Sequence, residues 1–156
     1  MTERSVTHAT FVVERSYDAS PARVFKAWSD PAAKSRWFGG SEESKAGYEL
    51  DFRVGGKEIN RGGPPGGPIY TFDARYQDIV TDQRIVYSYD MCVGATRISV
   101  SLATVELKPA GGATRLIFTE QGVFLDGHDN PAQRQQGTGE LLDALNVELR
   151  REPTSA

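Results

Sequence analysis

Apolar residues recur at every second position through most of the middle of the chain, which is the period of a β-strand with one buried face. A clear run is Tyr70, Phe72, Ala74 and Tyr76. With a similar segment near the N-terminus, the alternation predicts strands over residues 7–17, 48–52, 69–79, 84–91, 98–107 and 114–121. Segment 62–68 contains two adjacent prolines, which would remove ladder donors, so we predict an exposed hairpin loop there.

Three X-Pro pairs predict the starts of helices. Ser20, Asp30 and Asn130 each precede a proline, so their side chains would cap a helix whose first position is the proline. The predicted helices cover residues 21–28, residues 31–37 before the pair Gly39-Gly40, and residues 131 to about 151. The last helix carries an apolar stripe formed by Leu141, Leu142, Leu145 and Leu149.

This order of elements predicts an α+β fold. A single amphipathic helix must bury its stripe against another layer, so we expect a curved antiparallel sheet of six or seven strands wrapped around the long C-terminal helix. Two short helices would follow the first strand. The length of 156 residues and a hydrophobic content of 38% fit one domain over residues 1–156.

Composition excludes several classes of partner. The net charge of −3 comes from interspersed acidic and basic residues without a basic block, so neither nucleic acid nor an anionic membrane is expected as a partner. No apolar run approaches the roughly 20 residues of a membrane span, and the N-terminal residues lack the layout of a signal peptide. The single cysteine, Cys92, excludes an internal disulfide and favours a cytoplasmic location.

The sequence offers no nucleophile–base set, because its two histidines are His8 in a predicted strand and His128 in a loop. That loop, residues 124–131, also holds Asp126 and Asp129 but lacks calcium-loop spacing, so we interpret it as a helix-capping surface loop. The glycines at 137 and 139 lack the third glycine and preceding strand of a dinucleotide site. We therefore predict no metal and no cofactor.

Several blocks in a fixed order carry a resemblance to a known family. They cover residues 13–40, 52–58, 76–91, 111–122 and 137–149. The chain resembles the START-related (SRPBCC) superfamily with its helix-grip fold, and within it the bacterial branch related to the activator of the heat shock protein 90 ATPase. The resemblance implies a deep cavity between sheet and long helix. Relatives use such cavities for lipids, sterols, polyketides or hormones, a few catalyse cyclisation, and others bind a chaperone.

One departure from the family pattern falls at the start of the last helix. Many relatives carry a tryptophan there, just after a glycine, whereas this chain has Gly137, Thr138 and Gly139. Each glycine costs about 1 kcal/mol relative to alanine in a helix interior. Either the backbone packs closely at these positions, which is the commoner use of glycine, or space is left at the cavity mouth. We predict that this pair of glycines sets the size of the cavity, with Gly139 among the residues that contact a ligand.

Glu120 follows Leu116 and Phe118 at alternate positions, so it shares their face and would point into an apolar chamber. It would then need a donor such as Arg97, Tyr87 or Tyr89. A ligand anchor or general acid/base is the functional interpretation, and a structural hydrogen bond is the commoner alternative. The residues predicted to contact a ligand are Trp37, Phe38, Tyr76, Tyr87, Tyr89, Phe118, Glu120, Gly139 and Leu142.

The aromatic residues leave two interpretations open. Tyrosines among apolar walls suit a site for a semi-polar organic molecule, but most aromatics fill cores, and Trp28 is expected to do so. Which tyrosines face inward stays open, because one β-bulge inverts the parity of all later residues.

The leading functional hypothesis is therefore binding of a small hydrophobic or semi-polar molecule between the sheet and the C-terminal helix. The alternatives are a cyclase or hydrolase that uses Glu120 and a cavity tyrosine, and a chaperone-binding regulatory module. A homodimer is the remaining partner hypothesis.

Overall fold

The computed structural model describes residues 3–38 and 45–151. In chain order the elements are β1 (Val6–Tyr17), α1 (Pro21–Ser29), α2 (Pro31–Trp37), β2 (Lys45–Leu50), β3 (Lys57–Gly62), β4 (Tyr70–Val80), β5 (Arg84–Val93), β6 (Thr96–Ala110), β7 (Ala113–Leu125) and α3 (Pro131–Leu149). The predicted stop at Gly39-Gly40 lies outside the described residues.

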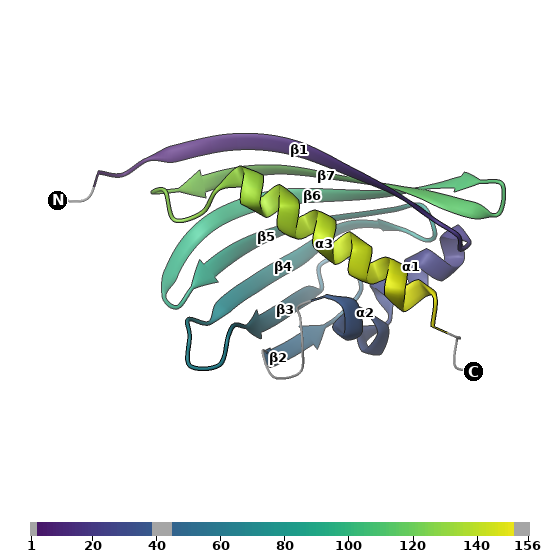
Figure 1. The fold of residues 1–156 in the computed structure, drawn as a ribbon, viewed down its shortest axis with the longest axis horizontal. Helices are drawn as coiled ribbons and strands as arrows, with labels where there is room; N and C mark the ends of the chain where they lie inside the picture. Colours follow the sequence, from purple (N-terminus) through teal and green to yellow (C-terminus); the bar gives the residue numbers. More distant parts are fainter. Residues whose placement is uncertain (1–2, 39–44, 152–156) are drawn as a thin grey trace.

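The strands form one antiparallel sheet in the order β1-β7-β6-β5-β4-β3-β2. The sheet curves around α3, which crosses its concave face, while α1 and α2 lie at the end where α3 finishes (Figure 1). The predicted helix-grip architecture is confirmed. No helix in the described part of the chain is long and apolar enough to cross a membrane.

The three predicted helix starts are confirmed in atomic detail. Ser20 Oγ accepts a hydrogen bond from the Arg23 amide at 3.2 Å, and Asp30 Oδ2 accepts one from Ala33 at 3.3 Å. Asn130 Oδ1 accepts one from the Ala132 amide at 2.8 Å. Each cap satisfies an amide that would otherwise lack a partner at the start of a helix.

Strand β3 is the element that the hydrophobic pattern missed. Its sequence, KEINRG, turns Glu58 and Asn60 inward and leaves Ile59 half-buried, so its buried face is polar and gives no apolar alternation. β3 pairs with β4 as far as Gly62 opposite Tyr70. The segment 62–68 thus connects a hairpin, as predicted.

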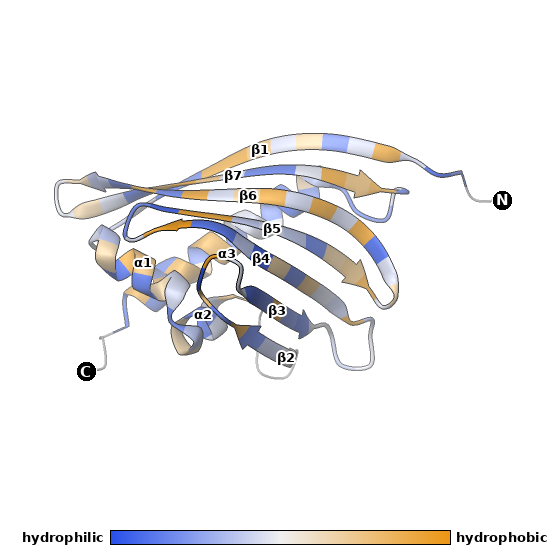
Figure 2. Cartoon of the chain, turned by 180° about the vertical axis from the view of Figure 1, so that it is seen from behind, coloured by the Kyte–Doolittle hydropathy of each residue, from blue (hydrophilic) through white to orange (hydrophobic). Residues whose placement is uncertain are grey.

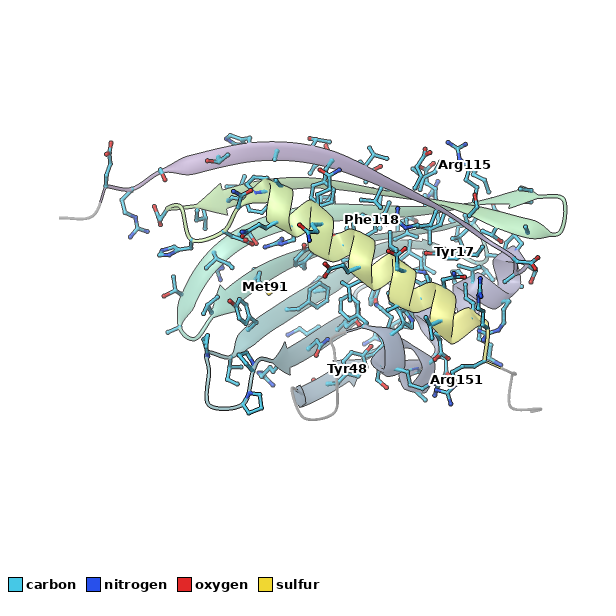
Figure 3. All side chains as sticks on the ribbon, viewed as in Figure 1. Tyr17, Tyr48, Met91, Arg115, Phe118 and Arg151 are labelled. Carbon is cyan, nitrogen blue, oxygen red and sulfur yellow. The ribbon has the colours of Figure 1, made fainter. Side chains whose placement is uncertain are left out.

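Alternation along the long strands produces the core. Hydrophobic and hydrophilic bands follow one another along β4, β5 and β6 (Figure 2). On β7 Leu116, Phe118 and Glu120 are all buried, so the predicted shared face is confirmed. Phe118 lies on the side of the sheet that faces α3, whereas Arg115 points away (Figure 3).

Candidate ligand cavity

A cavity of about 540 Å³ lies between the concave face of the sheet and α3. Strands β3 to β7, the three helices and the two loops 63–64 and 126–130 all contribute to its wall. The lining residues are Trp28, Trp37, Phe38, Asn60, Gly62, Gly63, Pro64, Tyr70, Phe72, Tyr87, Tyr89, Met91, Ile98, Phe118, Glu120, Asp129, Gln133, Arg134, Gly137, Thr138, Leu141 and Leu142.

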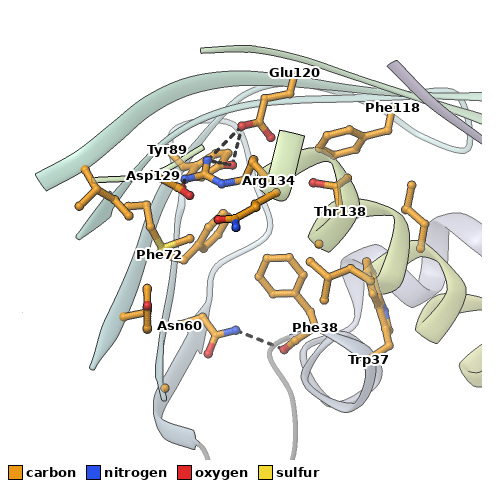
Figure 4. A pocket seen from close by; sticks show the side chains of 18 of the residues that line it. Trp37, Phe38, Asn60, Phe72, Tyr89, Phe118, Glu120, Asp129, Arg134 and Thr138 are labelled. Atoms are coloured by element: carbon orange, nitrogen blue, oxygen red, sulfur yellow. Dashed lines mark hydrogen bonds and ion pairs between the residues drawn. The ribbon is translucent and has the colours of Figure 1, made fainter. Parts of the chain in front are cut away.

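Glu120 is the more deeply buried of the two carboxylates that line this cavity, and its side chain is 1% exposed. Its Oε2 accepts hydrogen bonds from the hydroxyls of Tyr89 and Ser101, each at 2.8 Å, and from Arg134 Nη1 at 3.2 Å (Figure 4). Burial raises the pKa of Tyr89, and the charge of Glu120 raises it further, so the tyrosine remains the donor at neutral pH.

Arg134 comes from the first turns of α3 and reaches across the cavity to the sheet. Its Nη2 donates to Asp129 Oδ2 at 2.6 Å and to Ser99 Oγ at 2.7 Å, and its Nη1 also donates to the Tyr89 hydroxyl at 2.8 Å. The guanidinium carbon lies 5.6 Å from the centre of the Tyr89 ring and 5.1 Å from that of Phe124. These contacts tie the start of α3 to β5, β6 and β7.

Aromatic side chains form the opposite side of the cavity (Figure 4). The Trp37 indole N–H donates to the Ala27 carbonyl at 2.9 Å, which fixes α2 against α1. Its ring packs edge-on against Trp28 at 4.8 Å, and the Phe38 and Phe72 rings are 5.0 Å apart. Trp28, at 1% exposure, is a core residue as expected, and it also lines the cavity.

Helix α3 presents three adjacent pairs to the cavity, four residues apart. They are Gln133 and Arg134, then Gly137 and Thr138, then Leu141 and Leu142. Residues four apart lie on one face of a helix, so the lining changes from polar at the helix start to apolar further along.

The two glycines of α3 have different environments: Gly139 is not in the cavity lining where a ligand contact was predicted, but it shows the predicted close packing, and Gly137 shows the predicted open space. Gly139 does not line the cavity: a Cβ there would lie 2.9 Å from Arg15 Nη2, on the side of β1. Gly137 does line it, and a Cβ there would meet nothing within 4 Å. Two residues along a helix turn by about 200°, so the two positions face opposite ways. Of the two explanations for the glycines, close packing therefore holds at Gly139 and open space at the cavity holds at Gly137.

Gly137→Ala is therefore expected to raise the free energy of unfolding by about 1 kcal/mol, because alanine is the better helix former and its methyl group enters open space. Chemical denaturation measures the change. Gly139→Ala is the matched control and should gain less, since the Arg15 guanidinium must move. An equal or larger gain at 139 would contradict this assignment.

A second buried polar cluster lies behind the aromatic wall and was not predicted. Lys34 Nζ contacts both oxygens of Glu58, at 2.9 and 3.0 Å, and both residues are 0% exposed. The hydroxyls of Tyr48 and Tyr76 donate to the same carboxylate at 2.8 and 2.7 Å. Burial lowers the pKa of Lys34, and Glu58 opposes that shift. Tyr76 thus belongs to this cluster and not to the cavity lining, contrary to the prediction.

The cavity brings together seven of the nine predicted ligand contacts: Trp37, Phe38, Tyr87, Tyr89, Phe118, Glu120 and Leu142. Of the three proposed donors to Glu120, only Tyr89 reaches it; Arg97 pairs with Asp90 on the exposed face at 3.0 Å.

The main omission is Arg134, for which the four-residue spacing to Thr138 and Leu142 was the available signal. Asp129 pairs with it, so the loop 124–131 does more than cap α3.

Comparison with known proteins agrees with this geometry. The Mll3558 protein of Rhizobium loti is 51% identical, with a TM-score of 0.87, over 92% of this chain and 99% of that one. An uncharacterized protein from Rhizobium leguminosarum is 49% identical, with a TM-score of 0.92, over 97% and 100% of the two chains. The CV1439 protein of Chromobacterium violaceum shares the fold at 23% identity, with a TM-score of 0.74 over 92% and 98%.

No curated protein matches the chain. Residues 18–150 match the family described as Activator of Hsp90 ATPase homolog 1-like protein, which confirms the resemblance carried by the sequence blocks. The chain therefore belongs to this family.

Proposed function

We propose that the chain binds a small, largely apolar organic molecule in the cavity between the sheet and α3. The observation that carries this proposal is the cavity itself, about 540 Å³ in volume and lined mainly by aromatic and aliphatic side chains with one polar cluster. Small-molecule sites have volumes of about 300–1,000 Å³ and similar linings. Burial of apolar ligand surface would supply most of the affinity, at roughly 25 cal/mol per Å².

The two tryptophans of the chain, Trp28 and Trp37, both line the cavity and provide a direct readout. We expect a cavity ligand found in a thermal-shift screen to change the intrinsic tryptophan fluorescence in a saturable way. Gly137→Phe should weaken binding at least tenfold, because the ring enters the open space in the cavity wall, while the melting temperature is kept.

Gln136→Phe is the matched control, since it adds the same ring on the exposed side of α3 and should leave binding unchanged. A screen of several hundred apolar and semi-polar compounds in which none changes the fluorescence would refute the proposal. Equal loss of binding in both variants would place the site elsewhere.

An enzyme is the second candidate, and one observation favours it: a buried carboxylate, Glu120, accepts a hydrogen bond from the Tyr89 hydroxyl inside the cavity. Such a pair can move a proton to or from a bound molecule. Mass spectrometry of each identified ligand after incubation with the protein tests for turnover. Turnover that persists in a folded Glu120→Gln variant would exclude this residue as the acid or base.

The family description names an activator of the Hsp90 ATPase, and chaperone binding by this chain stays a prediction. A pull-down with Hsp90 tests it, and sedimentation of the purified protein tests the predicted homodimer.

A further inference from the structure

The guanidinium of Arg134 is the only cation among the described lining residues, yet it is already occupied. Both terminal nitrogens make two hydrogen bonds each, to Tyr89 and Glu120 from Nη1 and to Ser99 and Asp129 from Nη2. An arginine recognises a carboxylate best through two neighbouring free N–H groups. The described contacts leave only Nε without a partner, so Arg134 lacks the free fork that an acidic ligand needs.

The charges at this end of the cavity also disfavour an anion. One positive charge on Arg134 and two negative charges on Glu120 and Asp129 leave a formal charge of −1. Both ion pairs are at least four-fifths buried, so water screens them weakly. A carboxylate entering here would face net repulsion.

Glu120 and Tyr87 each place in the lining a polar atom without a partner among the described residues; the Trp28 indole N–H, on α1, is also unpaired but is itself fully buried. Every hydrogen bond to Glu120 goes to Oε2, so Oε1 is a free acceptor. The Tyr87 side chain is 3% exposed and its hydroxyl makes no hydrogen bond within the described part of the chain. Buried polar groups are normally hydrogen-bonded, so both groups are suited to a ligand.

The register of the sheet places these two groups in one row. Tyr87 on β5 lies opposite Ala103 on β6, and Ala103 lies opposite Glu120 on β7. Only the methyl group of Ala103 stands between them, so the two side chains face a common space about two strand spacings, or roughly 10 Å, across. Burial is the main cause of the raised pKa of Tyr87, and Tyr89 and then the Glu120 carboxylate raise it further, which keeps the hydroxyl protonated.

We propose that the cavity selects ligands whose polar group donates hydrogen bonds, a hydroxyl or an amine, and rejects carboxylates, with Glu120 Oε1 as the acceptor and Tyr87 as the second polar contact. This selectivity rests on the proposed binding function. Asp129 contributes to this selectivity indirectly. Its carboxylate accepts a hydrogen bond from Nη2 of Arg134 and adds the second negative charge.

The test compares four naphthalenes that carry a methyl, hydroxymethyl, aminomethyl or carboxylate group at the same ring position, with binding measured by calorimetry. The alcohol or the amine should bind at least about tenfold more tightly than the methyl compound, because a hydrogen bond to a charged group is worth at least that factor. The carboxylate should bind most weakly. The order of alcohol and amine identifies which donor the site takes.

Two variants locate the selectivity. Asp129→Asn removes a negative charge and loosens Nη2, so the affinity for the carboxylate relative to the alcohol should rise about tenfold. Glu120→Gln should abolish the preference for donors. If Glu120→Gln does not fold, Tyr87→Phe provides the second measurement and should weaken binding of the preferred donor.

The outcomes separate this inference from the proposed function. A carboxylate that binds the wild-type protein as tightly as the alcohol and the amine overturns the selectivity and leaves ligand binding intact. If the alcohol and the amine bind no more tightly than the methyl compound, the selectivity is likewise overturned and ligand binding is left intact. Failure of all four compounds to bind overturns both the selectivity and the proposed cavity function for molecules of this size.

Discussion

Lys34→Met is expected to lower the free energy of unfolding by about 3–5 kcal/mol, a large part of the 5–15 kcal/mol that stabilises a domain of this size. Methionine is apolar and can occupy the position of Lys34, whose ammonium nitrogen lies 4.9, 5.6 and 4.3 Å from the ring centres of Trp28, Trp37 and Phe38. It removes the charge that neutralises Glu58, and this carboxylate is 0% exposed. The remaining partners of Glu58 would be two neutral hydroxyls.

Urea denaturation of the wild type, Lys34→Met, Glu58→Gln and the double variant measures the coupling between the two residues. The double variant should be more stable than Lys34→Met alone, because no uncompensated charge stays buried. If Lys34→Met proves too unstable to purify, recovery of folding in the double variant makes the same point. Losses that simply add would contradict an ion pair as the origin of the effect.

The ion pair between Lys34 and Glu58 also supports the cavity wall, because of the two elements that it joins. Lys34 belongs to α2 and Glu58 to β3, so the pair joins the short helix to the sheet. The same helix carries Trp37, whose indole forms part of the cavity wall. Loss of the pair is therefore expected to loosen that wall as well as to reduce stability. A lower ligand affinity in Lys34→Met would report the loosening.

Local patterns predicted most of the fold because they depend on neighbours in sequence. Capping residues before prolines located the helices, and alternation located six of seven strands. β3 was missed because its inward residues, Glu58 and Asn60, are polar and obtain their partners from α2 and from the Phe38 carbonyl, 24 and 22 residues away. Such long-range compensation leaves no periodic signal in the strand.

The residues of the candidate site were predictable only where side chains alternate along a strand without interruption between the two faces of the sheet. Glu120 follows Leu116 and Phe118 without a bulge, and the irregularities at Tyr76/Asp78 and Met91/Cys92 leave Tyr87 and Tyr89 in phase on β5. Arg134 was missed because its partners are on strands and a loop that fold back to α3. The first half of that helix is polar in sequence, although one of its faces lines the cavity.

Alkaline unfolding is the second large effect that we expect. Burial is the main cause of a raised pKa at five tyrosines: Tyr17, Tyr48, Tyr76, Tyr87 and Tyr89. Below pH 10 these hydroxyls are protonated in both states, so they have no effect on stability. Above the ordinary pKa of about 10, the unfolded chain releases protons that the folded chain retains, so the free energy of unfolding falls as the pH rises.

Each tyrosine lowers stability by about 1.4 kcal/mol per pH unit, so five together give about 7 kcal/mol per pH unit above pH 10. A domain with about 5–15 kcal/mol of stability should therefore unfold within roughly one to two units of that pH. In a Tyr70→Phe background, which removes the exposed tyrosine, circular dichroism and tyrosinate absorbance should show one coincident transition, because the buried hydroxyls ionise only when the chain opens.

Tyr87→Phe provides the matched control for this titration. The Tyr87 hydroxyl makes no hydrogen bond among the described residues, so its removal should change stability little at neutral pH. Above pH 10 the variant has four linked protons where the wild type has five, and its loss of stability should fall to about 6 kcal/mol per pH unit. Tyrosinate absorbance that rises for these residues well before the circular dichroism changes would mean that the cavity opens to hydroxide while the fold is intact.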